Sequence, residues 1–243
     1  MSYASRLFVA ELGESGVVTS DAVGSPVRLP MTDEEEIHGV KPRPAWSHRR
    51  RRVRVAAQYH VGVPGDSLTE HLRTHALRTD GPFTLRSGVV AAWYLDARQT
   101  TFSGEGAWLV GEAVLAAVDP SARAVGGMTM GADPIAIATA MVAAREGREL
   151  DAFSIRKEAK DHGTGGRVVG PVFPGTRVAI LEDTTTTGGA AVEAADAAIA
   201  EGLEVVQAIA LVDRSGDLAS KAFAARGIPY RALVVPNDLG VGE

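Results

Sequence analysis

The chain has no cysteine, which excludes a disulfide framework, a thiolate metal site and a cysteine nucleophile. It also lacks long apolar runs, and none approaches the roughly 20 residues of a membrane-spanning helix. The short apolar stretch 7–10 ends at Glu11, so it is too short for the core of a signal peptide. With 243 residues, 45% of them hydrophobic, the sequence predicts a cytoplasmic globular protein with a full core.

Positive charge is scarce in most of the chain. Residues 1–65 carry 9 basic and 7 acidic side chains, a net charge of +2, whereas residues 66–243 carry 16 and 23, a net charge of −7. An acidic body argues against general binding of nucleic acid, because phosphate contacts need clustered cations.

The first 65 residues differ in kind from the rest. They hold an acidic run at 33–36 and four arginines at 49–52, with little periodicity of 2 or 3.6 residues. We therefore predict an N-terminal extension over 1–65, poorly ordered or loosely docked, and one domain over 66–243. The arginine run could bind RNA or an acidic surface, but no aromatic residues interleave it as stacking platforms, which favours a solvated linker.

Order is expected to begin at Ser67, where Ser67 and Glu70 form a capping box at the start of a helix running to about Leu77. On this helix His71 and His75 have the spacing of a zinc pair. No third ligand and no metalloprotease glutamate accompany them, so we favour an ordinary helix.

From there, short apolar runs alternate with alanine-rich amphipathic stretches, which is typical of βαβ units and a mainly parallel sheet. Ligands of such sheets bind beyond the carboxyl ends of the strands. The expected strands are 93–96, 124–128, 151–155, 177–181, 205–212 and 230–235, and the expected helices are 106–118, 133–145, 189–201 and 219–225.

The most informative segment is 177–189. An apolar strand ends in Glu182 and Asp183, whose hard oxygens suit ribose hydroxyls or a hydrated Mg²⁺. Four threonines and two glycines follow, and the positive end of a helix dipole then completes a cradle for a phosphate group. The segment lacks the lysine of a Walker A loop and the spacing of a dinucleotide fingerprint, which favours a sugar phosphate as the ligand.

With its acidic pair and threonine-rich turn, segment 179–189 resembles the phosphoribosyl pyrophosphate (PRPP) motif of the type I phosphoribosyltransferases. Segment 153–163, which holds three cations and a histidine, is similar to the catalytic loop of the orotate phosphoribosyltransferases. The resemblance covers about residues 67–240 and includes an orotate-side segment at 83–88, a pyrophosphate-side loop at 126–136, a strand end at 211–214 and a C-terminal segment at 238–240.

This resemblance implies an α/β fold of the type I phosphoribosyltransferase class, with a five-stranded parallel sheet, a small hood and a homodimer. It also implies Mg²⁺, held mainly by PRPP and water, and transfer of ribose 5-phosphate from PRPP to orotate with release of pyrophosphate. The residues implied as catalytic are Lys160, His162 and Asp183. Those implied as substrate-binding are Arg86, Tyr94, Arg156, Lys157, Glu182, Thr184, Thr185, Thr186, Thr187, Gly188, Gly189 and Arg214.

Individual roles follow from the same resemblance. Glu182 and Asp183 would hold the ribose and stabilise positive charge on its ring, and the threonine and glycine turn would bind the 5-phosphate. Lys157 would serve its own site, whereas Arg156, Lys160 and His162 would reach the partner's site. Arg214 and Arg86 would face orotate.

Two departures from the family pattern leave alternatives open. Segment 89–92 lacks a basic residue and a serine that are common there, and Gly131 stands where some members carry lysine. We therefore keep two alternatives: a phosphoribosyltransferase for another base, and a non-catalytic PRPP sensor that uses its arginine run on nucleic acid.

Overall fold

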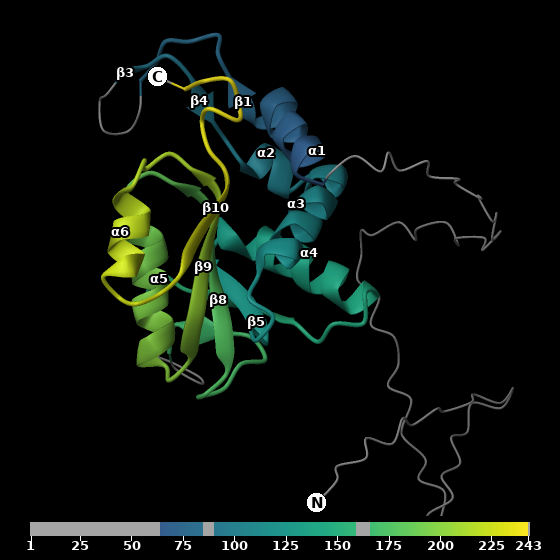
Figure 1. The fold of residues 1–243 in the computed structure, drawn as a ribbon, viewed down its shortest axis with the longest axis vertical. Helices are drawn as coiled ribbons and strands as arrows, with labels where there is room; N and C mark the ends of the chain where they lie inside the picture. The colour runs from purple at the N-terminus through teal and green to yellow at the C-terminus, as the bar shows by residue number, and fades with distance from the viewer. Residues whose placement is uncertain (1–63, 85–89, 159–165, 243) are drawn as a thin grey trace, which may run out of the picture. The chain divides into compact units, whose positions relative to one another are not determined.

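The computed structural model describes residues 64–84, 90–158 and 166–242 (Figure 1). The proposed extension, the arginine run, Arg86, Lys160 and His162 lie outside the described residues. The boundary at residue 65 therefore stays a prediction. No described helix is both long and apolar enough to cross a membrane.

A six-stranded sheet forms the centre of the domain, in the order β10-β9-β8-β5-β6-β7. Five strands are parallel and β7 runs antiparallel to β6, which confirms the predicted fold class and adds one edge strand that was not predicted. The strands are β5 (Ala124–Met128), β6 (Asp151–Ile155), β7 (Val168–Val169), β8 (Arg177–Thr185), β9 (Glu204–Asp213) and β10 (Tyr230–Val234).

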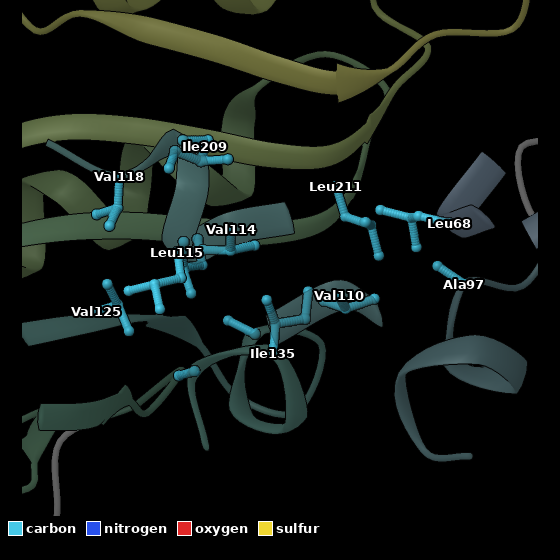
Figure 2. Close-up of a cluster of buried hydrophobic side chains, with 14 of the residues drawn as sticks. Leu68, Ala97, Val110, Val114, Leu115, Val118, Val125, Ile135, Ile209 and Leu211 are labelled. Atoms are coloured by element: carbon cyan, nitrogen blue, oxygen red, sulfur yellow. The ribbon is translucent and has the colours of Figure 1, made fainter. Parts of the chain in front are cut away.

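Helices cover both faces of this sheet (Figure 1). Helices α3 (Gly104–Ala117) and α4 (Ala132–Arg145) lie on one face, and α5 (Gly189–Ala200) and α6 (Leu218–Ala224) lie on the other. Each face has its own buried cluster. Figure 2 shows the cluster under α3 and α4, where Val110, Val114 and Ile135 meet Ile209 and Leu211 of β9.

Local signals explain where two of these helices begin. Ser103 is the N-cap of α3, and its hydroxyl accepts a hydrogen bond from the backbone N–H of Gly106 at 3.0 Å. Helix α5 follows Gly188, which has a φ of +83°, and a Cβ there would lie 3.0 Å from the Cα of Ala219. Gly188 thus lets the chain turn sharply from β8 into α5.

The hood consists of short elements around residues 64–101. They are α1 (Pro64–His71), the π-helix η1 (Leu72–Ala76), β1 (Leu77–Arg78), β2 (Phe83–Thr84), β3 (Val90–Ala91), β4 (Tyr94–Leu95) and α2 (Arg98–Thr101). Strand β1 pairs with β4, and β2 pairs with β3. The guanidinium of Arg73 donates to the backbone carbonyl of Asp238 at 2.8 Å, which ties the C-terminal segment to the hood.

The first helix departs from the prediction. It begins at Pro64 rather than at Ser67, and its last turns are a π-helix that ends at Ala76. Proline is favoured in the first turn of a helix because its missing N–H has no partner there in any case. His71 is buried, and its Nδ1 lies 3.1 Å from the Thr100 hydroxyl, so its side chain joins this helix to α2.

Candidate active site

A cavity of about 400 Å³ lies at the carboxyl ends of β5 and β8, where the hood meets the sheet. Four segments line it: the β4 end with α2, the turn after β5, the residue Lys157 after β6, and the end of β8 with the start of α5. The lining residues are Tyr94, Leu95, Asp96, Ala97, Arg98, Met128, Thr129, Met130, Gly131, Lys157, Glu182, Asp183, Thr184 and Ala190.

The acidic pair lies inside β8 rather than after it. Strand β8 runs four residues beyond the predicted 177–181, because its pairing with β9 continues through Thr185 opposite Asp213. Asp183 accepts a hydrogen bond from the backbone N–H of Thr184 at 2.8 Å, which orients its carboxylate. The sheet itself therefore holds both carboxyl groups.

Glu182 is the most perturbed acid of the site. Burial and, as a smaller cause, the negative charge of Asp183 together raise its pKa to about 8. Among the described residues, its buried Oε2 atom has no hydrogen-bond partner. A buried acceptor without a partner is typical of a group that waits for a ligand.

Gly131 packs directly against this pair. A Cβ at Gly131 would lie 2.7 Å from Oδ1 of Asp183, which is too close for an ordinary contact. The glycine therefore lets the turn after β5 approach the acidic pair.

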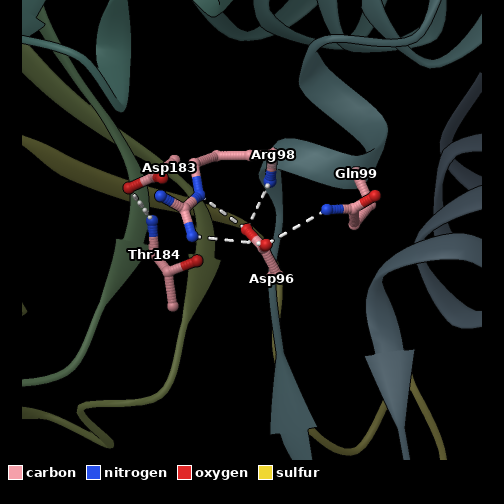
Figure 3. A network of polar contacts seen from close by, with 5 residues as sticks. All are labelled: Asp96, Arg98, Gln99, Asp183 and Thr184. Carbon is pink, nitrogen blue, oxygen red and sulfur yellow. Dashed lines mark hydrogen bonds and ion pairs between the residues drawn. The ribbon is translucent and has the colours of Figure 1, made fainter. Parts of the chain in front are cut away.

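Sequence reasoning missed Arg98 and Asp96 as site residues. Nε of Arg98 donates to Oδ1 of Asp96 at 2.7 Å, and Figure 3 shows the Arg98 guanidinium between Asp96 and Asp183. The hydrogen bond from Arg98 lowers the pKa of Asp96. Asp183 also contributes to raising the pKa of Arg98, after the larger effect of Asp96. The signal was present in the sequence: two charged residues, Asp96 and Arg98, lie within three positions after the strand that ends at Leu95.

The turn from β8 to α5 has the form of an anion cradle. Thr185 is buried at the end of the strand, whereas Thr186 and Thr187 are exposed. The hydroxyl of Thr187 lies 3.4 Å from the backbone N–H of Gly189, at the first residue of α5. The first backbone N–H groups of a helix have no partner within it, and the helix dipole adds positive potential there.

Arg214 lies in a second cavity, of about 630 Å³. This cavity is lined by Thr79, Ala92, Trp93, Arg214, Pro236, Val241 and Gly242. The Arg214 guanidinium stacks on the Trp93 ring, with its Cζ 4.0 Å from the ring centroid. Trp93 lines this cavity, and the next residue in the chain, Tyr94, lines the first one.

The remaining predicted residues divide into two groups. Tyr94 and Lys157 line the first cavity, and their role in substrate binding stays a prediction. Arg156 instead exchanges backbone contacts with Arg167: its N–H donates to the Arg167 carbonyl at 2.8 Å, and its carbonyl accepts from Nε of Arg167 at 2.8 Å.

No protein-family model matches the chain. Individual proteins of known family do match it. An orotate phosphoribosyltransferase of Streptomyces avermitilis is 47% identical over 176 residues, which covers 72% of this chain and 96% of that protein. The chain belongs to the orotate phosphoribosyltransferase family.

Solved structures agree with this assignment. The orotate phosphoribosyltransferase of Mycobacterium tuberculosis H37Rv in complex with Fe(III) dicitrate matches with a TM-score of 0.64 and 37% identity, covering 73% of this chain and 99% of that one. The same enzyme in complex with PRPP matches with a TM-score of 0.60 and 34% identity. The predicted resemblance and the type I phosphoribosyltransferase fold are thus confirmed.

Proposed function

We propose that the cavity beside Glu182 and Asp183 binds PRPP and that the cavity beside Arg214 binds orotate. The protein is an orotate phosphoribosyltransferase, which transfers ribose 5-phosphate from PRPP to orotate and releases pyrophosphate in pyrimidine biosynthesis. The observation that supports this arrangement is a pair of cavities with opposite chemistry, lined by the consecutive residues Trp93 and Tyr94. One holds a carboxyl pair next to an anion cradle, and the other holds a cation stacked on an aromatic ring.

The acidic pair would act on the ribose. Asp183 is oriented by the Thr184 N–H, so it can accept hydrogen bonds from the ribose hydroxyls. As the bond from the ribose to pyrophosphate breaks, positive charge develops on the sugar ring, and carboxylates close to it stabilise that charge. The 5-phosphate would lie at the start of α5, where Thr186, Thr187 and the first N–H groups of the helix surround it.

Cations are needed for the leaving pyrophosphate. Arg98 and Lys157 are the cations among the described residues that line the first cavity, and Lys160 and His162 of the catalytic loop would add to them. Mg²⁺ keeps several of its waters and binds through substrate phosphates, so it would enter with PRPP. The carboxylates of Asp183 and Glu182 fit this ion as acceptors for its water molecules. When bound, Mg²⁺ neutralises charge on the pyrophosphate.

We further propose a homodimer in which Arg156, Lys160 and His162 serve the partner's site. A pair of apolar side chains supports an interface: Ile137 and Met141 lie one turn apart on α4 and are 55% and 67% exposed. We expect the protein in the cytoplasm. The chain has no cysteine, so its fold does not depend on disulfide formation in an oxidising compartment.

The decisive assay mixes the purified protein with PRPP, Mg²⁺ and either orotate or a panel of other bases, and follows base consumption and pyrophosphate release. We expect consumption of orotate. The altered sequence of segment 89–92, of which Ala92 lines the second cavity, favours another base as the alternative, so consumption of another base with orotate untouched would reject orotate as the substrate. Salt-sensitive binding of RNA that is lost on deletion of residues 1–65 would instead support the alternative of a non-catalytic PRPP sensor.

The shared loop can be tested by mixing two inactive variants, Lys160→Ala and Asp183→Asn. In a mixed dimer, one site combines the intact loop of one protomer with the intact acidic pair of the other. We expect partial recovery of activity, about a quarter of the wild-type level if the protomers exchange at random. No recovery, with exchange shown by mass spectrometry, would place the loop in its own protomer's site.

A further inference from the structure

The backbone around Arg214 is held tightly. Its N–H donates to the carbonyl of Thr185 at 2.7 Å, and the next N–H, of Ser215, donates to Oδ1 of Asp213 at 2.7 Å. The hydroxyl of Tyr230 donates to the other oxygen of the same carboxylate at 2.9 Å. These bonds fix where the Arg214 side chain starts, but they do not fix where its guanidinium points.

The side chain of Arg214 stacks on Trp93. Within the described part of the chain, no carboxylate and no hydrogen-bond acceptor pairs with the Arg214 guanidinium, and burial lowers its pKa. A guanidinium held over the face of an aromatic ring is attracted by the ring without using its N–H donors in hydrogen bonds, so these donors remain available to a ligand. The stack therefore presents a fork of donors to the cavity.

We infer that Trp93 is a positioning residue that aligns Arg214 for the carboxylate of the base, and that it thereby sets the preference for a carboxylated pyrimidine. This inference rests on the proposed function of the second cavity. An unstacked arginine samples many rotamers, and fixing it in one rotamer on binding costs conformational entropy. A side chain already held in that rotamer before the ligand arrives does not add this cost to binding. Arginine suits planar carboxylates because two parallel N–H···O bonds can form.

The surroundings explain why this task falls to Trp93. Segment 89–92 consists of two valines and two alanines, whose side chains donate no hydrogen bond to a base. Trp93 itself is well supported: it packs against the cluster under α3 and directly precedes β4, which pairs with β1. A ring fixed in this way is a rigid surface for a mobile cation.

The chain offers a matched control. Trp108 on α3 also stacks with an arginine, Arg145 of α4, with the Arg145 Cζ 4.7 Å from the ring centroid. Trp108 packs against the same apolar cluster as Trp93, but it lines neither cavity described above. Replacing each tryptophan in turn therefore separates loss of packing from loss of alignment.

The test measures KM for orotate, KM for PRPP, kcat and the thermal midpoint of Trp93→Met, Trp93→Tyr and Trp108→Met. We expect Trp93→Met to raise KM for orotate about tenfold, in keeping with loss of a partly desolvated cation–π contact, and to leave KM for PRPP within about twofold. Its preference for orotate over uracil, which has no carboxylate, should fall. Trp93→Tyr, which keeps a ring, should stay within about threefold of wild type for orotate, and Trp108→Met should leave both KM values unchanged.

Three results would overturn the inference: an unchanged KM for orotate in Trp93→Met, equal rises in KM for orotate and PRPP, or an unchanged preference over uracil. If Trp93→Met shows no cooperative thermal transition, Trp93→Leu replaces it, and the same three criteria apply. Failure of the proposed function is seen separately, because the wild-type protein would then leave orotate unconsumed.

Discussion

The raised pKa of Glu182 predicts that this residue costs the fold stability at alkaline pH. In the unfolded chain a glutamic acid ionises near its ordinary pKa of 4.5, whereas in the folded protein burial and Asp183 delay ionisation to about pH 8. Between these values the folded state binds the proton more tightly, so its stability falls as pH rises through this window. The largest possible loss of unfolding free energy is about 5 kcal/mol, at about 1.4 kcal/mol for each unit of pKa difference.

Glu182→Gln removes this loss, because an amide of nearly the same shape does not ionise. Solvent reaches part of the side chain, so we expect about half of this largest loss, roughly 2–3 kcal/mol at pH 8.5, or a rise in Tm of about 5–10 °C. The difference from wild type should shrink steadily toward pH 5. Thermal unfolding of the ligand-free protein from pH 5 to 9 measures this directly.

The control is Glu149→Gln, at an exposed glutamate between α4 and β6. Its effect on Tm should be small and independent of pH. A difference between Glu182→Gln and wild type that stays constant from pH 5 to 9 would refute the reasoning, since it would mean that Glu182 ionises equally in both states. The variant should also lose turnover, which the orotate assay checks.

Three further predictions concern the same cavity. Lys160→Ala should lower kcat at least about 100-fold while changing PRPP affinity little, because a loop cation acts mainly in the transition state; equal losses in both, from kinetics and PRPP titration, would make it a binding residue. Asp183→Asn should lower kcat/KM for PRPP about 100-fold or more, and near wild-type kinetics would show that the acidic pair does not hold the ribose. Gly131→Ala should lower kcat/KM for PRPP at least tenfold with a small change in Tm, because its Cβ would push against Asp183; an unchanged kcat/KM would mean that the turn yields without cost.

Much of the central sheet could be predicted because its strands carry short apolar runs or alternate polar and apolar residues. Strands β5 and β6 have the predicted bounds, and α5 differs from its prediction by one residue. The two-residue strands of the hood could not be predicted, because two residues show no periodicity. The end of β8 was also missed, since the acidic residues Glu182 and Asp183 are of types depleted in strands, and pairing with β9 carries the strand through them.

The site was predictable in part for similar reasons. The acidic pair and the turn into α5 are contiguous in sequence, so their chemistry could be predicted from one segment. Arg98 comes from a distant element, and only the fold places its guanidinium near Asp183. Nor could the stack of Arg214 on Trp93 be predicted, because these residues are 121 positions apart and meet only through the hood.

The pairing of Thr185 with Asp213 has a consequence for how the enzyme could change. The proposed sugar-binding residue Asp183 lies in β8 and the proposed base-binding residue Arg214 directly follows β9, so the pairing of these two strands sets the spacing between the two proposed substrate sites. The hood supplies only the wall on the far side of the base. Redesign for a new nucleobase could therefore be confined to that wall, leaving the ribosyl chemistry intact.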